Sequence, residues 1–232
     1  MNWVDRIVLF DALDFAALAL LVTGWLLISW RIERPDAKHP STSQLMAGFR
    51  REWMMQLITR DPRVFDALIV SSLRQATAFF ASTAVIALGG ALAVLGNVDR
   101  LAGVANDLVL ATAPIFVWEA KLAVLALFLT NAFLKFAWAN RLFGYATVVM
   151  AAVPNDIDDP ACMIRARQAG EIHITAAKSF NRGLRSVYFA LTVVAWLAGP
   201  FALMMATAIT LAVIWWREFA SDSRDILLGA KT

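Results

Sequence analysis

The chain has 232 residues, of which 60% are apolar and 17% charged, and its formal net charge is +3. A soluble domain is about 45–50% apolar and about 25% charged, so this composition is too apolar for an ordinary soluble domain and also excludes a disordered chain, a collagen-like chain and a disulfide scaffold. Cys162 is the only cysteine and cannot form an internal disulfide.

The first three apolar stretches, in chain order, cover residues 7–30, 76–96 and 118–138. A helix crosses the bilayer core with about 20 mostly apolar residues, so we predict a span in each. The first is expected to be a retained span and not a signal peptide, because no small-residue cleavage site follows it. Trp118 and Trp138 stand at the two ends of the third span, where interfacial anchors are expected.

The fourth apolar stretch, residues 187–216, would be about 45 Å long as one helix, which is longer than one span. Gly199-Pro200 interrupts it, and proline disfavours a helical residue before it. We therefore favour a hairpin with spans at 183–198 and 201–217, and keep one long kinked helix as the alternative. The sequence predicts an all-α integral membrane helical bundle with four or five transmembrane helices, forming a single membrane domain over residues 1–232.

Basic residues concentrate in two connections, residues 31–75 and 139–182, whereas the connection between the second and third spans has only Arg100. By the positive-inside rule, we predict a multi-pass protein of the cell inner (plasma) membrane with both basic connections cytoplasmic and the amino terminus outside. The hairpin returns the carboxyl terminus to the cytoplasm, whereas a single helix leaves it outside.

Both basic connections show helix signals. Ser41, Thr42 or Ser43 can cap a helix, and apolar residues then recur on one side of it, which predicts an amphipathic helix in the headgroup layer. In the second connection, Asp159 followed by Pro160 predicts a helix start. We prefer this interpretation to a calcium loop, which would need a glycine and a distal glutamate.

Residues with catalytic or metal-binding chemistry are scarce. The two histidines, His39 and His173, fall in the connections, and no P-loop, dinucleotide fingerprint or nucleophile elbow is present. We therefore expect no enzyme activity, no cofactor, no metal and no nucleic-acid partner.

Ionisable residues at membrane depth are costly and usually serve a purpose. We predict a buried charge cluster near the outer ends of the first and third spans, consisting of Asp11, Asp14, Glu119 and Lys121. In this hypothesis Lys121 pairs with one of the aspartates; the alternative is that each residue reaches the interface separately. Asn131 is expected to bond to a neighbouring helix.

Several segments of the chain form a combined pattern: Arg51-Glu-Trp-Met54, Arg60-Asp-Pro-Arg63, Asp66-Ala67, Phe79-Phe-Ala-Ser-Thr83, Glu119-Ala-Lys121, Ser179-Phe-Asn-Arg-Gly-Leu-Arg185, Tyr188-Phe189, Gly199-Pro200 and Arg217-Glu-Phe219. In this pattern the chain resembles the domain-of-unknown-function 599 family of bacterial and plant membrane proteins. The resemblance implies a small polytopic membrane protein and implies no activity.

We expect a non-enzymatic accessory or interaction protein that contacts the lipid bilayer and another membrane protein or a second copy of itself. The candidate interaction or headgroup surface consists of Arg50, Arg51, Trp53, Arg60, Asp61, Arg63, Asp66, Asn181, Arg182 and Arg185. The alternative is a small-solute or ion transporter or channel, favoured by the charges at membrane depth and the broken hairpin.

Overall fold

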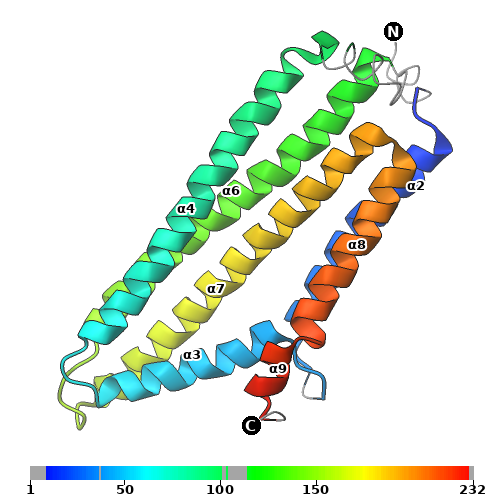
Figure 1. Cartoon of the computed structure of the whole chain (residues 1–232). Coiled ribbons are helices and arrows are strands. Elements are labelled where there is room, and N and C mark those ends of the chain that lie inside the picture. Colours follow the sequence, from blue (N-terminus) through cyan, green and yellow to red (C-terminus); the bar gives the residue numbers. More distant parts are fainter. Residues whose placement is uncertain (1–8, 37, 101–102, 104–113, 230–232) are drawn as a thin grey trace. The chain divides into compact units, whose positions relative to one another are not determined.

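The computed structural model describes residues 9–36, 38–100, 103 and 114–229, and within them the chain forms helices and turns but no strand (Figure 1). The predicted all-α class is confirmed. The elements are α2 (Ala12–Glu33), α3 (Thr42–Ile58), α4 (Val64–Leu95), α6 (Ile115–Ala151), α7 (Pro160–Val194), the 3-10 helix η1 (Ala195–Ala198), α8 (Pro200–Phe219) and α9 (Asp222–Leu227).

Four segments of the described chain are long and apolar enough to cross a membrane: α2, α4, α6 and the stretch Pro200–Leu227 that contains α8. These segments fit a membrane protein, as the composition predicts. The helix α4 has 32 residues and α6 has 37. At 1.5 Å per residue both exceed the roughly 30 Å of the hydrocarbon core, so each continues beyond its apolar span.

The predicted hairpin is present at Gly199-Pro200. The last turns of α7 lead into η1, and Gly199 then adopts a φ of 118°, which is accessible to glycine at little cost. Pro200 begins α8, where the missing proline N–H costs nothing. The hydroxyls of Thr192 and Thr210 lie 2.7 Å apart and join the two arms. Whether both arms cross the membrane stays a prediction.

The chain divides into two compact units. Unit 1 contains residues 1–31, 83–132 and 184–216, and unit 2 contains residues 32–82, 133–183 and 217–232. Since α4, α6 and α7 each contribute to both units, neither unit is one continuous segment. The single membrane domain expected over the whole chain stays a prediction, and the units are described separately below.

Unit 1 holds long stretches without any charged residue, at 15–30, 83–98, 122–132 and 186–216. Its core joins α2, α6 and α7 through aromatic rings, since Phe128 contacts Trp25 at 5.2 Å and Phe189 at 6.2 Å between ring centroids. The helix α8 runs beside α2 (Figure 1), and Leu211 lies against the position where Gly24 lacks a side chain.

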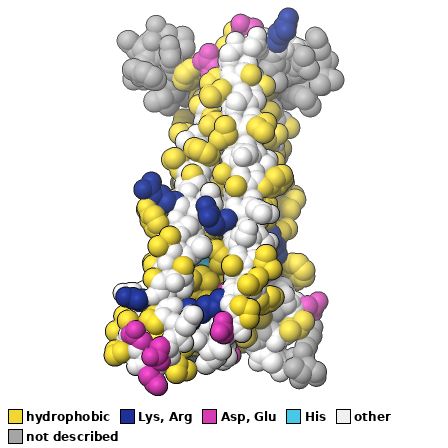
Figure 2. All heavy atoms as spheres, turned by 90° about the vertical axis from the view of Figure 1, so that its left-hand side faces the viewer, with side chains coloured by type: hydrophobic (Ala, Val, Ile, Leu, Met, Phe, Trp, Pro, Cys, Tyr) yellow, Lys and Arg dark blue, Asp and Glu magenta, His cyan; other side chains and the backbone are white. Residues whose placement is uncertain are grey.

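Large apolar side chains are exposed on the surface of the helices. Ile86 of α4 is 75% exposed and Leu127 of α6 is 68% exposed. Figure 2 shows hydrophobic side chains lying exposed along the helices on one face of the molecule. Exposed apolar surface of this kind marks contact with lipid or with another protein.

In unit 2, α3 packs against α7. Of the three predicted candidates, Ser41 is the N-cap of α3, and its hydroxyl accepts a hydrogen bond from the Gln44 N–H at 3.2 Å. The buried face of α3 consists of Met54, Leu57 and Ile58. Phe49 of the same helix is 46% exposed. Met54 contacts α7 at Gly170, where the missing side chain leaves room for it.

Gly183 of α7 is required by the ring of Phe136. A Cβ atom at residue 183 would lie 2.7–3.0 Å from three ring atoms of this fully buried phenylalanine. The Phe136 ring cannot easily move, because the rings of Phe80 and Phe180 pack on it, with distances of 5.5 Å and 5.4 Å between ring centroids.

We therefore expect Gly183→Ala to lower the free energy of unfolding by about 1–3 kcal/mol, the usual cost of overpacking. Thermal unfolding of the detergent-purified protein measures the change. Gly48→Ala is the control, since no atom lies within 4 Å of the new Cβ. Equal stabilities of the two variants would contradict this account of Gly183.

Candidate functional site

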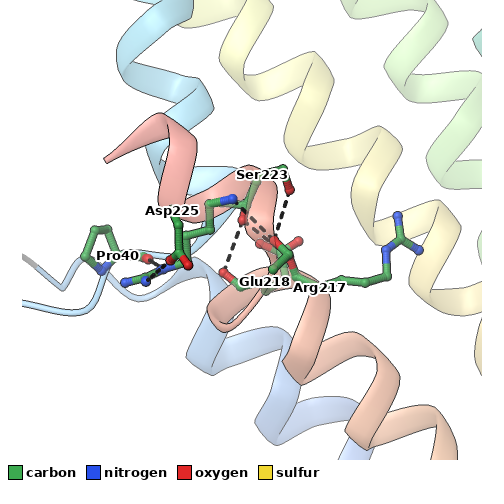
Figure 3. A network of polar contacts seen from close by, with 8 residues as sticks. Pro40, Arg217, Glu218, Ser223 and Asp225 are labelled. Carbon is green, nitrogen blue, oxygen red and sulfur yellow. Dashed lines mark hydrogen bonds and ion pairs between the residues drawn. The ribbon is translucent and has the colours of Figure 1, made fainter. Parts of the chain in front are cut away.

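The end of α8 binds the start of α3 within unit 2 (Figure 3). The backbone N–H of Ser43 donates to Glu218 Oε2 at 3.0 Å, and its hydroxyl donates to Oε1 at 2.9 Å. Arg224 Nε donates to the Pro40 carbonyl at 3.0 Å. A carboxylate at a helix N-terminus is favoured by the helix dipole, so Glu218 occupies the place that an external anion would otherwise take.

A polar pocket of about 250 Å³ lies next to this contact, between α3 and α7; we call it the α3–α7 pocket. The polar residues that line it are Thr42, Ser43, Arg50, Lys178, Asn181 and Glu218. Within the described part of the chain, Arg50 makes a single hydrogen bond, a long one of 3.5 Å from Nη1 to its own helix at the Met46 carbonyl. Its Nε is buried without a hydrogen-bond partner among the described residues. Burial lowers the pKa of the guanidinium.

His173 is a fully buried neighbour of Arg50. Its ring contacts Trp53 and Phe143 edge-on, each at 5.0 Å between centroids. Burial, and secondarily the positive charge of Arg50, lower its pKa to about 4. Neither ring nitrogen has a hydrogen-bond partner in the part of the chain that the structure describes. His173 is therefore neutral at neutral pH.

Asp66 is buried and binds two other residues of the predicted surface, Trp53 and Arg60. It is 1% exposed, accepts a hydrogen bond from Trp53 Nε1 at 2.6 Å and forms an ion pair with Arg60. Arg63 donates to the carbonyls of Val153 and Pro154 at 2.6 Å and 2.9 Å, and so binds the segment after α6. These residues hold unit 2 together.

We expect Asp66→Ala to destabilise the protein by about 2 kcal/mol, because it leaves the Trp53 N–H without its acceptor and removes the counter-ion of Arg60. Chemical denaturation, monitored by tryptophan fluorescence, measures the loss in the free energy of unfolding. Asp61→Ala is the matched control, since Asp61 is exposed. A loss no larger than in the control would show that the Asp66 contacts contribute nothing.

Other predicted surface residues are exposed in unit 2. Arg51 and Glu171 form a two-point ion pair with N–O distances of 2.5 Å and 3.2 Å, and each side chain is 57% exposed. This pairing raises the pKa of Arg51 and lowers that of Glu171. Arg182 pairs with Glu33 in the same two-point manner. Fixed charges of both signs therefore lie on this unit.

Arg185 belongs to unit 1, whereas the other predicted surface residues belong to unit 2. It is 4% exposed, and its Nε donates to the Ser29 hydroxyl at 3.1 Å. The predicted surface thus contains three kinds of residue. Some are exposed charges, some are internal contacts, and Arg50 and Asn181 line the α3–α7 pocket.

Of the predicted charge cluster, Lys121 and Asp14 are buried and linked through one tryptophan in unit 1. Lys121 Nζ donates to the Trp196 carbonyl at 3.0 Å, and the indole N–H of Trp196 donates to Asp14 Oδ1 at 2.6 Å. The Lys121 ammonium also lies 5.6 Å from the centroid of the same indole. Asp11 and Glu119 are exposed.

The expected contact of Asn131 with a neighbouring helix is confirmed, since its amide donates to the Ser186 hydroxyl of α7 at 2.6 Å. Within the described residues, no group of three or more His, Cys, Asp and Glu side chains could hold a metal ion.

The family model described as "Protein of unknown function, DUF599" matches residues 16–223. The chain belongs to the DUF599 family. The resemblance seen in the sequence is confirmed, and the match includes every predicted site residue except Asp11 and Asp14. No curated protein and no solved structure matches this DUF599 chain.

Proposed function

We propose that the protein is a non-enzymatic accessory protein of the inner (plasma) membrane that docks another membrane protein through unit 2. In this proposal the basic connections are cytoplasmic and the amino terminus is outside. The observation that carries the proposal is the fixed arrangement of exposed charges on helices, above all the Arg51–Glu171 pair. Charges held in place on rigid elements suit selective recognition of a partner.

Extraction in a mild detergent tests this proposal. We expect a membrane protein to co-purify with the tagged wild type in a fixed molar ratio. The double variant Arg51→Glu with Glu171→Arg keeps the ion pair and inverts its direction, so it preserves the fold and is expected to lose the partner. Arg167→Gln, which removes an exposed charge elsewhere on α7, is the control and is expected to keep it.

A lone homo-oligomer, or a partner that the inverted pair retains as well as the control does, would contradict docking through this surface. The first of these results would direct attention to the second candidate function.

The second candidate is a small-solute or ion transporter or channel. It is supported by the buried Lys121 and Asp14 of unit 1, because ionisable groups inside a membrane mark ion or substrate pathways. Flux into liposomes containing the purified protein separates the two functions. Selective flux that Asp14→Asn abolishes would favour the transporter over the accessory protein.

A further inference from the structure

Arg50, a half-buried cation on the wall of the α3–α7 pocket, forms no ion pair with any residue that the structure describes. Of its guanidinium nitrogens, Nη1 reaches only a main-chain carbonyl at 3.5 Å, and Nε is buried without a partner among the described residues. Buried charges in proteins are normally paired. Lys178 is a second cation on the wall of the same pocket.

The acidic residue of the pocket is already engaged. Both carboxylate oxygens of Glu218 accept hydrogen bonds from Ser43. Arg50 and Lys178 bring two positive charges and Glu218 one negative charge, and the neighbouring His173 is neutral. The pocket therefore carries one positive charge in excess, which suits a ligand with a single negative charge.

The volume of the pocket and its hydrogen-bond donors further restrict the class of ligand that it can bind. Its volume of about 250 Å³ lies below the range of about 300–1,000 Å³ that is usual for drug-sized and cofactor ligands. Arginine and lysine bind phosphate oxygens, arginine at two points. The Asn181 amide donates only a long 3.3 Å bond, to Ser43, and can turn towards a bound oxyanion.

We propose that the α3–α7 pocket binds a phosphodiester group, with Arg50, Lys178 and Asn181 as its donors. The group can be supplied by the headgroup of an anionic phospholipid or by a soluble phosphodiester. This inference deepens the proposed function, on which it rests for placing the two basic connections, and the pocket between them, on the cytoplasmic side of the membrane.

Binding to the purified full chain in a neutral detergent tests the proposal. The probes are dioctanoyl phosphatidylglycerol, its headgroup glycerophosphoglycerol, and dioctanoyl phosphatidylcholine. In the third probe the quaternary ammonium group balances the negative charge of the phosphodiester. We expect saturable binding of the first probe at one site and much weaker binding of the third. Binding of the headgroup alone with equal affinity identifies a soluble source, and its failure to bind identifies a lipid.

The pocket variants are Arg50→Gln and Lys178→Gln, and the second alters an exposed side chain, so its fold is retained. Each is expected to weaken binding about tenfold or more, because it removes a charge-assisted hydrogen bond. Arg167→Gln removes the same charge outside the pocket and is expected to change the affinity less than about twofold.

Two results would overturn the proposal. One is the absence of saturable binding of either phosphodiester to the wild type. The other is an equal loss of affinity in Arg167→Gln and Lys178→Gln, which would show that the phosphodiester is attracted to the basic surface as a whole and not bound in the pocket. Either result leaves the docking test intact, since that test uses Arg51 and Glu171.

Discussion

Replacing Lys121 with alanine is expected to destabilise the folded protein by about 3–5 kcal/mol, because it leaves the buried Asp14 carboxylate without a compensating positive charge. The Lys121 ammonium bonds the Trp196 carbonyl, and the indole N–H of Trp196 bonds Asp14. Without the lysine, the buried Asp14 carboxylate keeps its hydrogen bond but loses the nearby positive charge. Heating in detergent, followed by size-exclusion chromatography of the remaining monomer, measures the change.

The variant Asp14→Asn identifies the cause of that loss. Asparagine keeps an oxygen acceptor for the Trp196 N–H but carries no charge, so we expect it to rescue Lys121→Ala in part. Arg74→Ala, which changes an exposed cation of α4, is expected to be neutral. If the effects of Lys121→Ala and Asp14→Asn are additive in the double variant, the two charges are not coupled through Trp196.

The stability of the protein is expected to fall by about 3 kcal/mol as the pH is lowered from about 6.5 to about 4, because of His173. The pKa of this buried histidine is about 4 in the folded protein, against about 6.5 in the unfolded chain. Between these values the unfolded state binds more protons than the folded state. The contribution is therefore fully present above pH 6.5 and is lost as the pH falls.

The matched variant is His173→Leu, which has a similar volume and no titratable group, so it is expected to flatten the stability profile between pH 6.5 and pH 4. His39→Gln changes an exposed histidine and is expected to leave the profile unchanged. Glu171 adds a separate loss at lower pH, since its own pKa lies below the usual value. A profile that is the same in wild type and His173→Leu between pH 6.5 and pH 5 would assign the effect to other groups.

The features that the sequence predicts well are local ones. Ser41 caps α3 through its own side chain, and Gly199-Pro200 ends one helix and begins the next. Apolar length locates the end of α2 within three residues, and the Gly199-Pro200 break together with the apolar length locates α8 within two residues at each end. In each case the signal lies in adjacent residues, whose backbone preferences act before any tertiary contact forms.

The features that the sequence does not predict depend on contacts between distant segments. The partner of Lys121 is a main-chain carbonyl, which any residue type supplies, so no pattern points to Trp196. The charge of Asp66 predicts a surface position, whereas in the fold the side chain is buried, where it accepts a hydrogen bond from Trp53 and pairs with Arg60. The position of Glu218 is a usable sequence signal, because an acidic residue directly after an apolar span can bind a neighbouring polar segment.

Docking through unit 2 requires its two basic connections, residues 31–75 and 139–182, to lie on the same side of the membrane, opposite to the side predicted for Arg100. Cysteine labelling with a membrane-impermeant maleimide tests this requirement directly, in a Cys162→Ala background. The positions to compare are Glu52, Asp158 and Arg100, all of which are exposed. We predict that cysteines at 52 and 158 react only in inside-out vesicles and that a cysteine at 100 reacts in intact spheroplasts. Labelling of 52 and 158 on opposite sides, or of both together with 100, would contradict the account.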